Sequence, residues 1–86
     1  MPQIQVKVAA AEGLHARPAA NFVQAAKAQP VEVLISKEGK EPVSAKSMLK
    51  VLGLGAFKDD IVTLSAEGDG AEEALAALAK VIAESE

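Results

Sequence analysis

One short stretch of the chain holds the residue types that could do chemistry. The window Gly13–Ala19, G-L-H-A-R-P-A, places the only histidine, His15, two residues before the only arginine, Arg17, where a loop meets a predicted helix. Free N–H groups at a helix start attract anions, phosphate above all, and a guanidinium pairs with phosphate oxygens. A neutral imidazole is a nucleophile near neutral pH. The window therefore indicates a histidine that accepts a phosphoryl group, held by helix amides at Ala16 and by Arg17.

Other interpretations of this window stay open on spacing alone, because short motifs have many false matches. His15 could simply cap the helix, with Arg17 as a solvated charge. A small hydrolase with His15 as its base would need a nucleophile and an oxyanion site, and no nucleophile is evident. Metal binding is disfavoured because the chain has no second histidine and no cysteine. We expect no metal and no cofactor.

The composition limits the class of protein. The chain has 86 residues, half of them hydrophobic, which predicts one small globular domain over residues 1–86. The absence of cysteine excludes disulfides and thiolate chemistry. Two aromatic residues are too few for the stacking platforms of single-stranded nucleic-acid binders. The sequence contains neither a signal-peptide pattern nor a membrane-spanning run, so we expect a cytoplasmic chain with no membrane insertion.

Charge is divided unevenly along the chain. Residues 1–58 carry eight basic and four acidic side chains, whereas residues 59–86 carry one basic and eight acidic side chains. Such asymmetry is typical of a basic surface that meets phosphate or acidic partners. On charge alone, a solvated acidic C-terminal helix explains the pattern equally simply.

The elements that must position the window follow from the periodicity of apolar residues. Period-two alternation predicts strands, and three- and four-residue spacing predicts amphipathic helices. Asp69 is a suitable N-cap for the last helix, and Glu72 would complete a capping box. The expected order is a strand at 3–8, a helix from 16 that ends before Pro30, a strand at 31–36, a turn at 37–40, an edge strand at 41–44, a helix at 47–52, a strand at 60–66 and a helix at 70–83.

This order, β-α-β-β-α-β-α, predicts an α+β fold in two layers. Each helix and each strand has one apolar face to bury, and the simplest solution places all three helices on one face of a four-stranded antiparallel sheet. The periodicity does not determine the order of the strands in the sheet.

The short helix at 47–52 has more apolar side chains than it can bury fully. Either all of them face the sheet, or some form an exposed patch beside His15, ringed by lysines. Exposed apolar patches mark interaction sites, and methionine suits a surface that accepts several partners. The apolar residues are Met48, Leu49, Leu52 and Leu54, and the lysines are Lys27, Lys46 and Lys50.

The window at 13–19 resembles the active-site signature of HPr, the histidine-containing phosphocarrier of the bacterial sugar phosphotransferase system. The stretches at 45–55, A-K-S-M-L-K-V-L-G-L-G, and at 62–68, V-T-L-S-A-E-G, also resemble that family, and the similarity spans nearly the whole chain. The resemblance implies that His15 takes phosphate on Nδ1 from phosphorylated Enzyme I and passes it to sugar-specific IIA domains. It further implies an open-faced β-sandwich with strand order 1-4-2-3. Such a protein is a substrate of Enzyme I and not a stand-alone catalyst, and we expect it to be a monomer.

Ser47 begins the helix at 47–52, where its hydroxyl could simply be an N-cap that satisfies a backbone N–H. The resemblance places the same residue on a regulatory site phosphorylated by HPr kinase/phosphorylase. It also places Met48, Leu49 and Leu52 on the docking surface for partners, where we expect Lys27 and Lys50 to take part. A regulatory binding module that acts through Ser47 is the alternative function. Two features depart from the common pattern. The spacing from His15 to Ser47 is one residue longer, with the extra residue expected near 37–42, and Glu12 stands where many relatives carry a small polar residue. We expect the Glu12 carboxylate to point to solvent.

Overall fold

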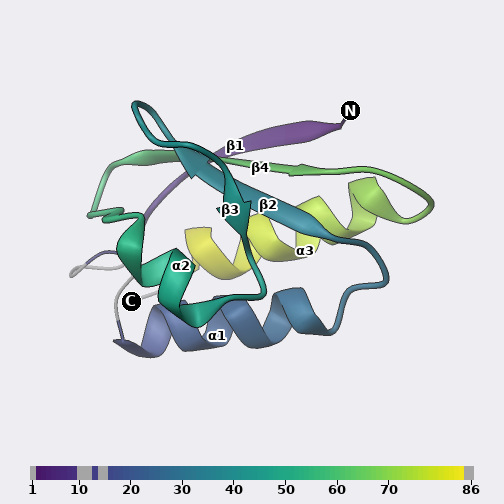
Figure 1. Cartoon of the computed structure of the whole chain (residues 1–86), viewed down its shortest axis with the longest axis horizontal. Helices are drawn as coiled ribbons and strands as arrows, with labels where there is room; N and C mark the ends of the chain where they lie inside the picture. Colours follow the sequence, from purple (N-terminus) through teal and green to yellow (C-terminus); the bar gives the residue numbers. More distant parts are fainter. Residues whose placement is uncertain (1, 10–12, 14–15, 85–86) are drawn as a thin grey trace.

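The structure, a computed structural model, describes residues 2–9, 13 and 16–84. Within these residues the element order agrees with the prediction; β3 has two residues where four were expected, and β2 begins two residues later than expected (Figure 1). The elements are β1 (Gln3–Lys7), α1 (Ala16–Lys27), β2 (Val33–Lys37), β3 (Val43–Ser44), α2 (Met48–Gly53), β4 (Ile61–Ala66) and α3 (Ala71–Ala83).

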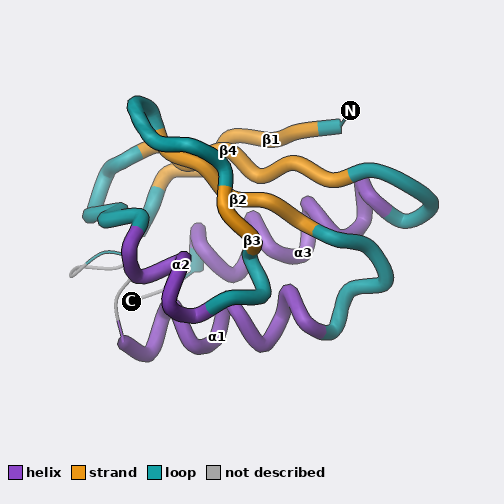
Figure 2. Tube along the Cα trace, viewed as in Figure 1, coloured by secondary structure: helices purple, strands orange, loops and turns teal. Residues whose placement is uncertain are grey.

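The four strands form one antiparallel sheet in the order β1-β4-β2-β3. All three helices lie on the same side of this sheet, and the other side is open (Figure 2). The two-layer α+β prediction is therefore confirmed, as is the strand order that the resemblance implied. The two-residue β3 lies at the edge of the sheet, and Pro42 precedes it, as expected for a residue that cannot donate to the ladder.

The core lies between the sheet and the helices. Alternate residues of β2 and β4 point toward the helices, so each strand contributes one buried face. The register Ile4↔Leu64 and Leu64↔Ile35 aligns apolar side chains across β1, β4 and β2. Helices α1 and α3 supply the opposing layer at three- and four-residue spacing, with Ala19, Phe22, Val23 and Ala26 from α1 and Ala71, Ala74, Leu75, Leu78 and Ile82 from α3.

The prediction for the start of α3 is wrong in one respect. The N-cap is Gly70, not Asp69, and it has a left-handed φ of 87° and no side-chain capping bond. A capping box with Glu72 cannot form, because the N-cap residue has no side chain. The turn is closed instead by the backbone, with the Ala71 N–H donating to the Gly68 carbonyl at 3.1 Å. Glu72 and Glu73 in the first turn still complement the helix dipole.

No helix within the described residues is long and apolar enough to cross a membrane.

Candidate functional site

The start of α1 is where the sequence places the phosphate-accepting window. The helix begins at Ala16, so its first turn follows directly on His15 in the chain. Arg17 is exposed, and none of the ion pairs within the described residues involves it. His15 and Glu12 lie outside the described residues, so the expectations for the imidazole and for the Glu12 carboxylate stay predictions. The part of the window that the structure describes is therefore Gly13 and the residues from 16 onward.

Gly13 is buried and packs directly against the chain between α2 and β4. Residues 55–60 form this connection, which we call the 55–60 loop. A Cβ built on Gly13 would overlap the carbonyl oxygen of Ala56 and would lie 2.7 Å from Cα of Phe57, both of them backbone atoms. The φ of Gly13 is 79°, a region that L residues rarely adopt. Both observations require glycine here, and they place the 55–60 loop against the first residue of the predicted phosphate-accepting window.

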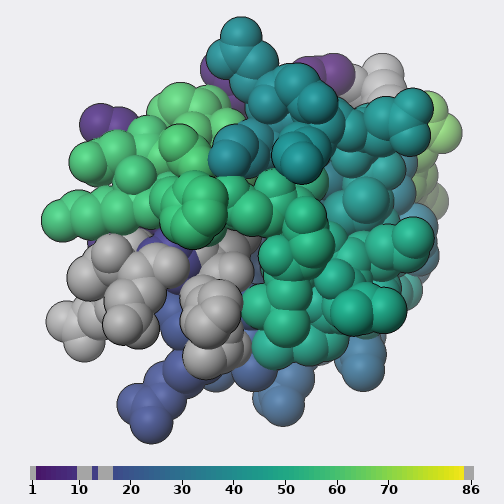
Figure 3. Space-filling view, turned by 60° about the vertical axis from the view of Figure 1, so that its left-hand side comes forward, coloured from purple at the N-terminus to yellow at the C-terminus, as the bar shows by residue number. Residues whose placement is uncertain are grey.

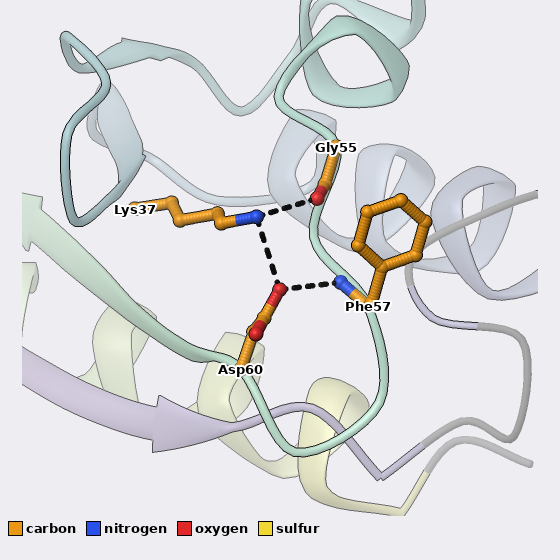
Figure 4. A network of polar contacts seen from close by, with 4 residues as sticks. All are labelled: Lys37, Gly55, Phe57 and Asp60. Carbon is orange, nitrogen blue, oxygen red and sulfur yellow. Dashed lines mark hydrogen bonds and ion pairs between the residues drawn. The ribbon is translucent and has the colours of Figure 1, made fainter.

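The 55–60 loop is held by a polar network with Lys37 at its centre (Figure 4). The Lys37 ammonium at the end of β2 donates to the Gly55 carbonyl at 2.7 Å and forms an ion pair with Asp60 at 3.0 Å. The Asp60 carboxylate also accepts a hydrogen bond from the Phe57 N–H at 2.9 Å. That backbone bond, and after it Lys37, hold the pKa of Asp60 below its ordinary value of 3.8. The Lys37 ammonium lies 5.3 Å from the centre of the Phe57 ring.

The chain that leads out of β1 is also bonded to the 55–60 loop. The Val8 N–H donates to the Asp60 carbonyl and the Asp59 N–H donates to the Val8 carbonyl, both at 2.9 Å. Asp59 has a φ of 72°, the only positive value among the non-glycine residues that the structure describes. The loop therefore contacts the first half of the molecule at Val8 and again at Gly13, five residues further along the chain.

Ser47 is the N-cap of α2, which confirms the capping role that its position suggested. Its Oγ accepts a hydrogen bond from the Lys50 N–H at 3.3 Å, and its carbonyl accepts one from Val51. The hydroxyl is engaged with the helix backbone at the protein surface.

Helix α2 leaves part of its apolar surface uncovered, next to α1. Leu49 is 79% exposed and Leu52 is 37% exposed, so the interpretation in which every apolar residue of this segment faces the sheet is wrong. Met48 packs partly against the core, and Leu54 is buried.

The start of α1, α2 and the 55–60 loop all reach one face of the molecule (Figure 3). Lys27 and Lys50 are exposed, whereas Lys46 forms an ion pair with Glu32 at 3.7 Å. Helices α1 and α2 pack against each other, which brings the predicted phosphate-accepting window and the exposed leucines into neighbouring parts of the fold.

Sequence reasoning missed the contacts by which Phe57, Lys37 and Asp60 hold the 55–60 loop. Phe57 is 63% exposed although it is one of only two aromatic residues, and it lies in the loop that contacts Gly13. Its position in a loop rich in charged residues was the available signal. The Lys37–Asp60 pair left no such signal, because the two residues are far apart in the sequence.

Comparison with known proteins agrees with this architecture. Residues 2–84 match the family model described as "PTS HPr component phosphorylation site". The chain is 52% identical to the phosphocarrier protein HPr of Streptomyces coelicolor, over 98% of this chain and 90% of that protein. It is 42% identical to the HPr-like protein Crh of Halalkalibacterium halodurans, over 91% and 92% of the two chains.

Solved structures show the same fold. The crystal structure of a phosphocarrier protein HPr from Bacillus anthracis superposes with a TM-score of 0.88 at 40% identity, covering 94% of this chain and 95% of that one. The open-faced sandwich with a helix starting at the histidine window is thus that of a small phosphocarrier. The chain belongs to the HPr family of the phosphotransferase system.

Proposed function

We propose that this protein carries a phosphoryl group on His15, taken from phosphorylated Enzyme I and delivered to sugar-specific IIA domains, and that it does so as a monomer. The observation that carries the proposal is the position of the helix start. Helix α1 begins at Ala16, directly after the only histidine, and Arg17 is exposed in its first turn. The family to which the chain belongs supports the same role.

The chemistry needs a nucleophile and a site for the negative charge. The lone pair of the His15 Nδ1 attacks phosphorus, and the bond from phosphorus to Enzyme I breaks as the new N–P bond forms. In the second transfer a nucleophile on the IIA domain attacks, and the electrons of the N–P bond return to the imidazole. The free amides of the first turn of α1 and the Arg17 guanidinium stabilise the phosphoryl oxygens in both directions.

The docking surface in this proposal is the uncovered side of α2 together with Lys50 of α2 and Lys27 at the end of α1. Leu49 and Leu52 offer apolar area, and Met48 lies beside them half-buried. Lys27 and Lys50 add positive charge, and α2 has no acidic residue in its first turn. This combination fits partners with an acidic rim around an apolar centre, because complementary charge speeds association and a buried apolar centre holds the complex.

Phosphorylation by Enzyme I tests the role of His15. The protein is incubated with phosphoenolpyruvate and Enzyme I, and the bound phosphate is expected to be labile in acid and stable in base. His15→Ala should abolish labelling, and Arg17→Gln should slow it by about tenfold or more, since charge-assisted contacts to phosphate are lost. Label that persists in His15→Ala would overturn the proposal.

Docking is tested by replacing one exposed apolar side chain at a time. Leu49→Ser is expected to raise KM for Enzyme I by about tenfold with little change in kcat, since it removes a central apolar contact and leaves the chemistry alone. Ile61→Ser is the matched control, because Ile61 is 46% exposed on β4 and lies outside the proposed docking surface. Equal KM values for the two variants would place the docking surface elsewhere.

A regulatory role through Ser47 is the second candidate, and the similarity to the HPr-like protein Crh favours considering it. A phosphate on Ser47 would bring about −1.5 to −2 charges to the start of α2, beside Leu49, where acidic partners would dock. Phosphorylation by HPr kinase/phosphorylase with Ser47→Ala as control tests this role. If Ser47 is phosphorylated while no phosphate passes through His15, the regulatory module becomes the better description.

A further inference from the structure

We propose that Lys37 and Asp60 are positioning residues for phosphoryl transfer, because they hold the 55–60 loop in the conformation that supports the window around His15. The inference rests on the proposed role of His15 and extends it to two residues that do not belong to that window. It assigns a function to a polar network on the surface that otherwise connects only a strand end and a loop (Figure 4).

The network fixes the loop at three of its six residues. Lys37 binds the Gly55 carbonyl and the Asp60 carboxylate, which lie at the two ends of the loop. Asp60 and Phe57 are joined twice, since the Phe57 N–H donates to the Asp60 carboxylate at 2.9 Å and the Asp60 N–H donates to the Phe57 carbonyl at 3.0 Å. A loop held by one ammonium at both ends has little freedom to move its middle.

The middle of the loop is the part that contacts Gly13. The Ala56 carbonyl and the Phe57 Cα lie so close to Gly13 that no Cβ fits between them. A shift of the loop backbone would therefore either open a gap beside Gly13 or displace Gly13. His15 follows two residues after Gly13 in the chain and immediately precedes α1. Only one residue separates Gly13 from His15, so a shift of Gly13 is expected to displace His15 as well.

Phosphoryl transfer is sensitive to such displacements. The attacking nitrogen, the phosphorus and the leaving group must be nearly in line, and the amides that stabilise the oxygens must already be in place. A misplacement of about 1 Å can cost up to a hundredfold in rate. Lys37 and Asp60 touch neither phosphate nor histidine in this proposal, and they act through the backbone of residues 55–57 and Gly13.

Two substitutions remove the network, and each has a matched control. Lys37→Met keeps most of the side-chain length and removes the ammonium, while Lys40→Met removes the same charge from an exposed residue of the neighbouring turn. Asp60→Asn keeps an oxygen for the Phe57 N–H, while Glu32→Gln makes the same change in the other ion pair, with Lys46. Lys37→Arg restores a cation and serves as the conservative variant.

The readouts separate positioning from folding and from docking. Steady-state phosphorylation by Enzyme I gives kcat and KM, and the lifetime of the isolated phosphohistidine needs no partner. The chain has one histidine, so its imidazole NMR signals report the pKa of His15 without overlap. Far-UV circular dichroism at the assay temperature verifies that each variant is folded.

We expect Lys37→Met to lower kcat by about tenfold with KM within about twofold, and to change both the phosphohistidine lifetime and the pKa of His15. Asp60→Asn should act in the same direction with a smaller change, Lys37→Arg should recover part of the loss, and both controls should match the unmodified protein.

If Lys37→Met and Asp60→Asn equal their controls in all three readouts, the proposal is wrong. Absence of phosphate on the unmodified protein, or its presence on His15→Ala, would instead refute the underlying role of His15.

Discussion

Two surface loops of this protein are held in place by different kinds of contact. The hairpin loop, residues 38–42 between β2 and β3, is closed by a backbone bond from the Lys40 N–H to the Lys37 carbonyl, and its Gly39 has nothing within 4 Å of a built Cβ. The 55–60 loop is held by the Lys37–Asp60 network and packs on Gly13. The Lys37 carbonyl closes the hairpin loop, whereas the Lys37 ammonium contacts the 55–60 loop. The 55–60 loop is thus fixed by polar contacts, by backbone packing on Gly13 and by one buried apolar residue, Ala56.

An added methyl group should lower the free energy of unfolding far more at Gly13 than at Gly39, and the loss at Gly13 is the largest effect we expect. Gly13→Ala should lower the free energy of unfolding by about 3 kcal/mol or more, because the new Cβ meets the backbone of residues 56 and 57 and the φ is positive. Gly39→Ala meets no atoms and should cost about 1 kcal/mol from its φ of 83° alone. Urea unfolding of both variants measures the difference. Equal losses would show that Gly13 is not in tight contact with the 55–60 loop.

Removal of the Lys37 ammonium should lower the thermal stability more than removal of the Lys40 ammonium. Lys37→Met should lower the thermal midpoint by a few degrees, since it breaks both the ion pair and the bond to the Gly55 carbonyl. Lys40→Met should leave the midpoint nearly unchanged, because Lys40 is exposed and takes part in the hairpin loop through its backbone. Differential scanning calorimetry on both variants provides the measurement. A larger loss in Lys40→Met would reverse the assignment of the two loops.

Acid should release the 55–60 loop and leave the hairpin loop unaffected. The pKa of Asp60 is lowered in the folded protein, first by the Phe57 N–H and then by Lys37. A lowered carboxyl pKa contributes stability at pH values above the unfolded-state pKa, and this contribution is lost as pH falls through the folded-state pKa. The difference in thermal midpoint between the unmodified protein and Asp60→Asn should therefore stay constant down to about pH 4 and shrink below it. A constant difference at every pH would mean that the Asp60 charge contributes nothing.

The smallest expected effect has the opposite sign. Asp59 adopts a φ of 72° in the 55–60 loop, a conformation that costs an L residue free energy and that glycine adopts freely. Asp59→Gly should raise the thermal midpoint by about 1–3 °C, with part of the gain offset by the larger chain entropy of glycine in the unfolded state. Asp69→Gly, at an exposed position that does not cap α3, is the control and should give no such rise.

Prediction from the sequence succeeded where the signal is local. The alternation in β2 and β4 and the helical spacing in α1 and α3 identified the elements, because those periods reflect one buried face per element. Ser47 was correctly interpreted as a cap, since an N-cap bonds an amide only three residues away. The same logic failed at Asp69, where backbone turns at two glycines, 68 and 70, move the helix start by one residue.

The sequence by itself determined the helices and strands, the two-layer architecture and the family, and it predicts His15 with Arg17 as the chemical centre. Only the tertiary structure decided that Leu54 is buried while Leu49 is exposed, that the 55–60 loop packs on Gly13, and that Lys37 pairs with Asp60. The reason is physical. Helix and strand periods are set by neighbours a few residues away, whereas these contacts join residues 13 with 56 and 37 with 60, which are distant in the sequence and are brought together by the fold.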